Sequence, residues 1–230
     1  MYPKPIKNFV DRFSKLPSVG PRQAARLAFW LLNQPKTYRS ELKKALEDLE
    51  KETKTCPQCF FVIDGSASFD KVHGSTSLTI NKEDKSLTIK NDGNKCGFCD
   101  NPSRDQKTIC VVEKETDLAT IEKSGVYNGL YHVLGGLFSA LDTAVPKNLR
   151  LPELIVRIQE HKKNKTAEEV ILALSPTHEG DLTVHYLERA LKPLKIKITR
   201  LGRGLPYGAD VEFADAETLS GALEGRKEIK

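Results

Sequence analysis

The chain has 230 residues, 39% hydrophobic and 29% charged, with a formal net charge of +5. This balance allows a buried core and excludes a wholly disordered chain. No uninterrupted apolar run is long enough to cross a bilayer, which excludes a protein built on membrane-spanning helices. The first residues lack the apolar stretch of a signal peptide, so we expect a cytoplasmic protein.

The positive charge is concentrated at the amino-terminal end. Residues 1–40 carry a formal charge of +7, with Asp11 as their one acidic residue and eight basic ones: Lys4, Lys7, Arg12, Lys15, Arg22, Arg26, Lys36 and Arg39. A cationic segment on a near-neutral chain suggests contact with a polyanion such as nucleic acid. The alternative is a solvated basic surface without a partner.

Three helices are predicted in the first 53 residues. Apolar residues recur at helical spacing over 6–16, and a second helix is expected from Pro21, which suits a first turn. A third helix is expected over 40–52, where leucine and alanine form an apolar stripe. Residues 1–53 are therefore predicted to form a small, basic, all-helical unit.

The connection between the first two helices, Leu16–Ala24, resembles a helix–hairpin–helix DNA-binding element. In that element, backbone N–H groups of the turn and of the next helix contact a phosphate. Arg22 and Arg26 are four residues apart on one helix face, and with Lys15 they are the predicted DNA-binding residues. Ser18 stands where the element usually has glycine. The alternative is an ordinary helical hairpin that packs its apolar residues inward.

Two cysteine pairs, Cys56–Cys59 and Cys96–Cys99, have the CxxC spacing of metal-binding knuckles. Two such pairs supply four thiolates for a tetrahedral Zn²⁺ at roughly 2.3 Å, a closed shell that is structural and leaves no position for water. The pairs are separated by 36 residues, against a usual spacing of roughly 15 to 20. His73 lies in this gap as an alternative ligand, although a surface histidine is the simpler interpretation. Redox-active CxxC is the other alternative.

The gap also contains a predicted β-hairpin, which explains its length. The tetrad Ser-Leu-Thr-Ile occurs at 77–80 and again at 86–89, around the polar connection 81–85. Alternating residues on both sides of a short polar connection are typical of a hairpin. Such a hairpin would bring the ends of the 60–95 insertion together.

From residue 107 onward, apolar strands alternate with amphipathic helices, which predicts an α/β unit with a parallel sheet covered on both faces. Cys110 lies within the first strand and is expected to be a buried core residue. Asn128–Gly129 is typical of a tight turn. The predicted strands are 108–112, 170–174 and 196–201, and the predicted helices are 117–123 (closed by Gly125), 152–161, 182–191 and 216–223 (capped by Asp215).

Several further motifs, in this order and after the hairpin and the cysteines, resemble the RecR family of bacterial recombination mediators. They are Pro102–Asp105, Ile109–Glu113, Tyr131–Gly136, Ser175–Asp181 and Arg203–Gly208. The resemblance implies four parts: a helix–hairpin–helix unit (1–53), a four-Cys zinc finger with an inserted hairpin (54–106), a Toprim domain (107–202) and a carboxy-terminal segment for subunit contact (203–230).

The Toprim resemblance also directs attention to three acidic residues. Toprim enzymes hold Mg²⁺ with a glutamate, matched by Glu113, and with an Asp-x-Asp pair. This chain has Ser175-Pro-Thr177 in place of that pair, followed by Glu179 and Asp181. Two hydroxyls cannot supply the charge of two carboxylates, so two-metal catalysis is not expected. A single weakly held Mg²⁺ and a protein-binding acidic surface both remain open.

The resemblance implies a ring-forming, non-enzymatic clamp. It implies a homotetramer that binds single-stranded or gapped DNA without reading sequence. It further implies that the protein acts together with RecO, and sometimes RecF, to load RecA onto strands coated by single-strand-binding protein. The alternative of a different class is a Mg²⁺-dependent Toprim enzyme, such as a nuclease, primase or topoisomerase.

Overall fold

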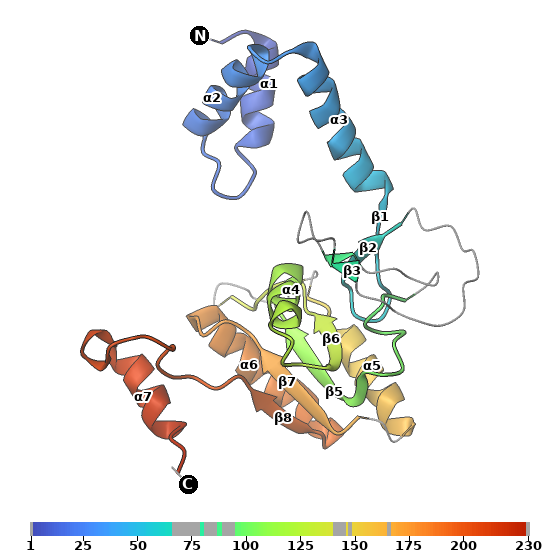
Figure 1. Ribbon diagram of the computed structural model, residues 1–230, viewed down its shortest axis with the longest axis vertical. Coiled ribbons are helices and arrows are strands. Elements are labelled where there is room, and N and C mark those ends of the chain that lie inside the picture. The colour runs from blue at the N-terminus through green and yellow to red at the C-terminus, as the bar shows by residue number, and fades with distance from the viewer. Residues whose placement is uncertain are drawn as a thin grey trace. The chain divides into compact units, whose positions relative to one another are not determined.

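A computed structural model describes residues 2–65, 79–80, 87–88, 95–139, 146, 149–164 and 167–228 (Figure 1). The chain divides into two compact units, Met1–Thr53 and Lys54–Lys230, and each is described by itself. Within the described part, no helix combines the length and the apolar character that crossing a membrane requires.

The amino-terminal unit consists of three helices, α1 (Lys4–Phe13), α2 (Pro21–Leu32) and α3 (Lys36–Lys51). Proline occupies the first position of α2 as predicted, where its missing N–H costs no hydrogen bond. The helix α3 begins four residues earlier than predicted, directly after Pro35. Its first turn lacks the apolar spacing on which the prediction depended.

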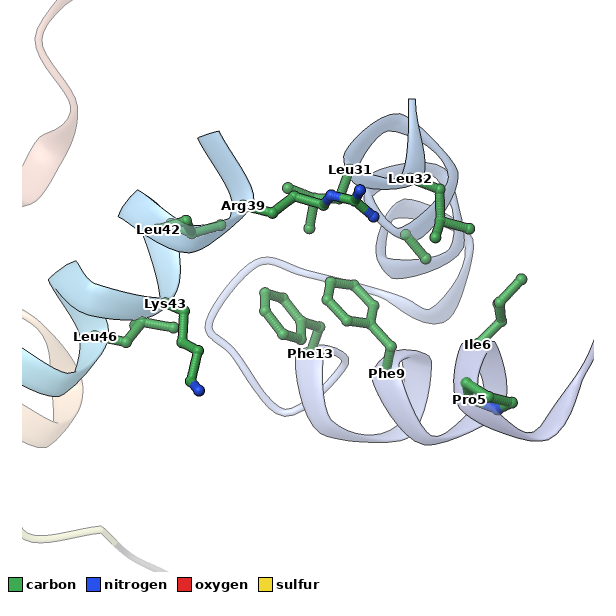
Figure 2. A pocket seen from close by; sticks show the side chains of 11 residues that line it. Pro5, Ile6, Phe9, Phe13, Leu31, Leu32, Arg39, Leu42, Lys43 and Leu46 are labelled. Carbon is green, nitrogen blue, oxygen red and sulfur yellow. The ribbon is translucent and has the colours of Figure 1, made fainter. Parts of the chain in front are cut away.

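The helical unit has a small core and an apolar pocket. Three alanines of α2 are buried, which lets α1 approach closely, and the rings of Phe9 and Phe13 stack with centroids 3.8 Å apart. The pocket, of about 380 Å³, is lined by side chains from all three helices (Figure 2). Arg39 and Lys43 of α3 are the charged residues that line it.

The second unit is built on a four-stranded parallel sheet, which confirms the predicted α/β class. The strands lie in the order β6-β5-β7-β8 (Figure 1). Their bounds are β5 Asp105–Val112, β6 Gly129–Val133, β7 Glu169–Ala173 and β8 Lys197–Arg200. The helices that connect and follow them are α4 Glu115–Ser124, α5 Leu151–Lys163 and α6 His178–Leu191.

Successive side chains of β5 are buried on opposite faces of this sheet. Ile109 and Val111 pack into a cluster with residues of α5 and α6. Cys110 and Val112 pack into a second cluster, which contains α4 and three of the knuckle cysteines. Cys110 is therefore a core residue, as predicted, and the cysteine knuckles are packed against one face of the sheet.

The smaller elements agree with the predicted hairpin as far as they are described. Strands β1 (Thr53–Thr55) and β2 (Val62–Asp64) pair with each other. Strands β3 (Thr79–Ile80) and β4 (Leu87–Thr88) are antiparallel, with Thr79 opposite Thr88. The predicted connection 81–85 and His73 lie outside the described residues.

Two predicted helix ends are confirmed. Gly125 ends α4 in the left-handed conformation, with φ of 68°, which glycine adopts without strain. A side-chain oxygen of Asp215 accepts a 2.9 Å hydrogen bond from the Thr218 N–H at the start of α7 (Ala216–Glu224). Two short 3₁₀ helices, Lys192–Leu194 and Val211–Phe213, lie between α6 and α7.

The predicted tight turn at Asn128–Gly129 is wrong. Gly129 is the first residue of β6, which runs parallel to β5, so no hairpin forms there. A Cβ on Gly129 would lie 2.3 Å from both the Thr108 Oγ1 and the Tyr127 hydroxyl. The glycine is therefore explained by close packing inside a sheet rather than by turn geometry.

Candidate nucleic-acid interface and metal centre

The turn before α2 presents an uncapped helix N-terminus beside exposed cations. Gly20 is the N-cap residue, no side chain of the described residues caps the helix, and its first turn holds no acidic residue. Lys15, Arg22 and Arg26 are all exposed. Free N–H groups and flanking cations form an arrangement that favours an anion. The assignment of these three residues to DNA binding stays a prediction.

Ser18 adopts the backbone conformation for which the related elements use glycine. Its φ is 62°, one of three positive values among the non-glycine residues that the structure describes. The left-handed region costs an L-residue roughly 1–2 kcal/mol because Cβ approaches the following carbonyl oxygen. The turn therefore keeps the shape of the glycine-containing element at some cost in stability.

We expect Ser18→Gly to stabilise the helical unit by about 0.5–1 kcal/mol, since relief of strain outweighs the extra chain entropy of glycine. Trp30 of α2 is the one tryptophan of the chain, so its fluorescence during urea unfolding reports on this unit. Ser18→Ala, which retains the strain, is the matched control. Equal midpoints for Ser18→Gly and Ser18→Ala would contradict this interpretation.

The structure brings the four predicted cysteine ligands together. Their sulfur atoms all lie within 4.8 Å of one another, with Cys59 Sγ 3.1 Å from Cys96 Sγ. Cys56, Cys59 and Cys96 are fully buried, and none of the four forms a disulfide. Two thiolates bound to one tetrahedral zinc ion lie about 3.8 Å apart, so this cluster fits a metal ion with little rearrangement.

Each knuckle is a tight turn closed by backbone hydrogen bonds. The Phe60 N–H donates to the Cys56 carbonyl at 3.0 Å, and the Cys99 N–H donates to the Cys96 carbonyl at 2.9 Å. The hydrogen bond with Cys59 lowers the pKa of Cys56, whereas the same contact raises the pKa of Cys59. Without a cation, the thiols therefore cannot all be deprotonated, and a metal ion would remove this conflict.

The first knuckle lies along the outer edge of β6. The Val133 N–H donates to the Cys59 carbonyl at 2.8 Å, and Arg157 of α5 donates to the carbonyls of Tyr131 and Gln58. A strand at the edge of a sheet has unpaired polar groups, and here the knuckle and an arginine pair with several of them. The cysteine cluster is thus part of the packing of the sheet.

A buried ion pair fastens the second knuckle to the same sheet. Arg104 donates to both carboxylate oxygens of Glu122, at 2.9 and 2.8 Å, and its Nε donates to the Gly129 carbonyl. The guanidinium lies over the rings of Phe98 and Tyr131, with centroids 5.0 and 5.4 Å away. Phe98 is one of the two residues between Cys96 and Cys99, so this pair joins the knuckle to α4 and β6.

The three acidic residues from the Toprim resemblance are not gathered as a cation site. Glu113 directly follows β5, while Glu179 and Asp181 lie in the first turn of α6. Among the described residues, the four cysteines are the one group of three or more potential ligands close enough to share an ion. Arg203 donates a hydrogen bond to Asp181, which holds the pKa of that carboxyl below its ordinary value.

The Thr177 hydroxyl and the Ser175 backbone carbonyl of Ser175-Pro-Thr177 both shape the start of α6. The Thr177 side chain caps α6 by accepting from the Gly180 N–H at 3.1 Å. A Cβ on Gly180 would lie 2.0 Å from the Ser175 carbonyl oxygen. This segment therefore makes a tight entry into α6, where Toprim enzymes place two of their metal-binding carboxylates.

Sequence reasoning missed three buried polar residues beside the cysteine cluster and the sheet. Arg104, Arg157 and His132 are each less than a tenth exposed. Burial lowers the pKa of His132 to about 3, so its imidazole is neutral, with Nε2 2.9 Å from the Arg150 carbonyl oxygen. Arg104 belongs to the Pro102–Asp105 motif of the family pattern. No sequence signal, however, identified Glu122 as its ion-pair partner.

Comparison with known proteins decides the family. The family model described as "RecR, helix-hairpin-helix" matches residues 6–49, the Toprim domain model matches 107–202, and "RecR, C-terminal" matches 204–227. The "Recombination protein RecR" of Roseiflexus sp. (strain RS-1) is 38% identical over 227 residues, which cover 99% of this chain and 95% of that protein. The chain belongs to the RecR family.

Membership of the RecR family makes this chain a recombination protein and not an enzyme, although it contains a Toprim domain. The alternative of a catalytic Toprim protein is thereby set aside. The resemblance inferred from the scattered motifs is confirmed over nearly the whole chain. The four cysteine sulfur atoms lie close enough together to bind one metal ion.

Proposed function

We propose that this chain mediates DNA repair by binding single-stranded or gapped DNA, and that it assists RecA loading together with RecO and, in some settings, RecF. The observation that carries the DNA-binding part is the exposed cationic face beside the uncapped N-terminus of α2, within the segment that matches the RecR helix-hairpin-helix model. Such contacts reach the phosphates and leave the bases unread.

The proposed contact combines two attractions. Backbone N–H groups at the start of α2 donate to a phosphate oxygen, and the positive end of the helix dipole adds to this. Arg22 and Arg26, one helical turn apart, flank the same phosphate region, while Lys15 lies just before the turn. Because every nucleotide has a phosphate, this mode of binding suits gapped and single-stranded DNA of any sequence.

We also propose a homotetrameric ring in which the carboxy-terminal segment contacts another subunit. Several large apolar side chains in this segment are strongly exposed in the single chain: Tyr207, Val211, Phe213 and Leu223. Exposed apolar groups of this size favour burial against a partner. The segment matches the RecR carboxy-terminal model. We propose a cytoplasmic location near the nucleoid, where the proposed DNA ligand lies.

For the cysteine cluster we propose a structural Zn²⁺, one in each chain, bound by Cys56, Cys59, Cys96 and Cys99. Four soft thiolates in a closed, buried shell suit zinc, which has no need of a fifth ligand. We propose no resident Mg²⁺ at Glu113, Glu179 and Asp181, because Asp181 is engaged by arginine. These acidic residues suit a surface for a protein partner instead.

The double variant Arg22→Ala, Arg26→Ala tests DNA binding. We expect its affinity for single-stranded DNA to fall at least about tenfold at moderate salt. The slope of log K against log [salt] should decrease in magnitude by about 1–2, since two phosphate contacts are lost. Fluorescence anisotropy of a labelled oligonucleotide, titrated with full-length protein at several salt concentrations, measures both quantities.

The matched control is Lys44→Ala, Lys51→Ala, which removes the same charge from exposed positions on α3. We expect this control to change affinity only modestly and to leave the salt slope near that of the wild type. If the Arg22, Arg26 variant titrates like the wild type at every salt concentration, the proposed DNA contact is wrong.

A further inference from the structure

Arg157 of α5 contacts three separate parts of the second unit. Its Nη1 donates to the carbonyl of Gln58, at 3.1 Å, and to that of Tyr131. Its Nη2 lies 3.5 Å from the Cys99 Sγ, within the range of an N–H···S hydrogen bond. Gln58 belongs to the first knuckle, Cys99 to the second and Tyr131 to the edge strand β6. A single side chain therefore joins both knuckles to the sheet.

The charge of Arg157 needs compensation that these contacts do not supply by themselves. The residue is 5% exposed, and a buried guanidinium is costly unless an opposite charge lies nearby. Within the described part of the chain, no carboxylate forms an ion pair with it, and its buried Nε has no hydrogen-bond partner. Two neutral carbonyls satisfy donors but do not neutralise a cation.

A metal ion held by four thiolates supplies that compensation. Four thiolates carry more negative charge than a divalent ion neutralises, so the loaded centre is anionic. Arg157 donates to one of those four sulfurs, which places the cation directly against this negative charge. Hydrogen bonds to a metal-bound ligand fix its orientation and tune its electron density. The charge of the arginine and that of the loaded centre therefore stabilise each other.

We propose that Arg157 is a positioning residue of the metal centre, which retains the ion by holding the Cys99 thiolate and by locking both knuckles to β6. This inference rests on the proposed zinc site. It makes metal binding and the edge of the Toprim sheet depend on each other: loss of the ion leaves the arginine cation buried without a counter-charge, and loss of the arginine weakens the hold on the ion.

The test compares Arg157→Met and Arg157→Lys with the wild type, using full-length protein. Met keeps much of the side-chain volume and removes all donors, whereas Lys keeps the charge but loses the planar fork. Lys163→Met, at an exposed position on the same helix, is the matched control. Zinc transfer to an excess of chromogenic chelator is followed with time. We expect Arg157→Met to release zinc roughly 10–100-fold faster, in line with the loss of affinity that removal of such a contact causes, with Arg157→Lys in between and the control unchanged.

Cobalt substitution separates a direct action on the thiolate from general support of the fold. An N–H···S bond withdraws electron density from the sulfur, so its loss should move the sulfur-to-cobalt charge-transfer band to lower energy. We expect this shift in Arg157→Met and a smaller one in Arg157→Lys. A residue that only supports the fold would leave the band in place.

The outcomes distinguish this inference from the proposal on which it rests. A folded wild-type protein that binds neither zinc nor cobalt refutes the metal centre itself. A wild-type protein that binds both metals, with variants that release zinc at the same rate and keep the cobalt band, refutes the role of Arg157 alone. If Arg157→Met does not fold, Arg157→Lys decides, because wild-type release and band position in that variant also refute the role.

Discussion

Replacing Arg104 by Met is expected to lower the free energy of unfolding of the second unit by about 3–5 kcal/mol, because the Glu122 carboxylate would remain buried without its partner. The pair is bidentate, and the two side chains are only 6% and 9% exposed. The variant also loses the hydrogen bond to the Gly129 carbonyl and the contacts with two aromatic rings. Urea unfolding of the full chain, followed by far-ultraviolet circular dichroism, measures the change.

Two controls test the stated cause. Adding Glu122→Gln to Arg104→Met removes the unpaired charge while keeping an acceptor for the Tyr131 hydroxyl, which now donates to Glu122 at 2.9 Å, so most of the loss should be recovered. Lys107→Met breaks an ion pair with Glu168 whose side chains are 59% and 62% exposed, and should lower the free energy of unfolding far less, because solvent screens an exposed pair. Equal costs for Arg104→Met and Lys107→Met would disprove the argument from burial.

Features that depend on neighbouring residues in the sequence were predictable. The CxxC pairs place two thiols on one tight turn, so their spacing alone indicated a metal-binding cluster. Gly125 and Asp215 end and begin helices through contacts within four residues of themselves. The continuous apolar run Ile109–Val112 in β5 predicted a strand in a sheet covered on both faces. In each case the interaction that fixes the structure is local, or repeats with the period of the element.

Features that depend on distant residues were not predictable. Asn128–Gly129 has the composition of a turn, but the approach of Thr108 and Tyr127 decides the local structure. Arg157 has the appearance of one more charged residue on an amphipathic helix. Its contacts with Gln58, 99 residues away in sequence, and with Cys99 become visible only in the folded structure. Single-sequence reasoning found the four cysteines that the structure gathers, but not the buried arginine that contacts one of them and the sheet.

The same distinction applies to the turn before α2, which we propose contacts DNA. The sequence indicated its place between two helices and the cations around it, because these follow from spacing and charge. The sequence also indicated that Ser18 stands where the element usually has glycine. The structure adds that this residue has a positive φ, which strains the backbone of a non-glycine residue. The turn therefore tolerates a residue that its own geometry disfavours, which is typical of segments whose shape serves contact rather than stability.

Removing the proposed zinc ion is expected to have the largest effect on the second unit. Structural zinc in small domains contributes an apparent binding free energy of about 10–16 kcal/mol, comparable to the whole stability of a typical domain, about 5–15 kcal/mol. Because the knuckles cover one face of the sheet and the edge of β6, their loss would expose part of the core around Tyr131 and Val133. Chelation should therefore destabilise the sheet as well as the knuckles.

Cys96→Ser is expected to abolish tight zinc binding and to open the segments 54–64 and 95–104 to protease, since Cys96 is fully buried and Cys59 and Cys56 both contact it. Elemental analysis of protein purified without added metal should give about one zinc ion for each wild-type chain and almost none for the variant. Limited proteolysis locates the opened segments.

Cys110→Ala is the matched control. Cys110 is equally buried and packs in the same cluster, but burial raises the pKa of its thiol to about 12 and it is not one of the four gathered ligands. It should keep its full complement of zinc and its protease resistance. A wild-type protein that is purified without zinc and resists protease equally with and without chelator would show that packing, and not a metal ion, holds the four thiols together.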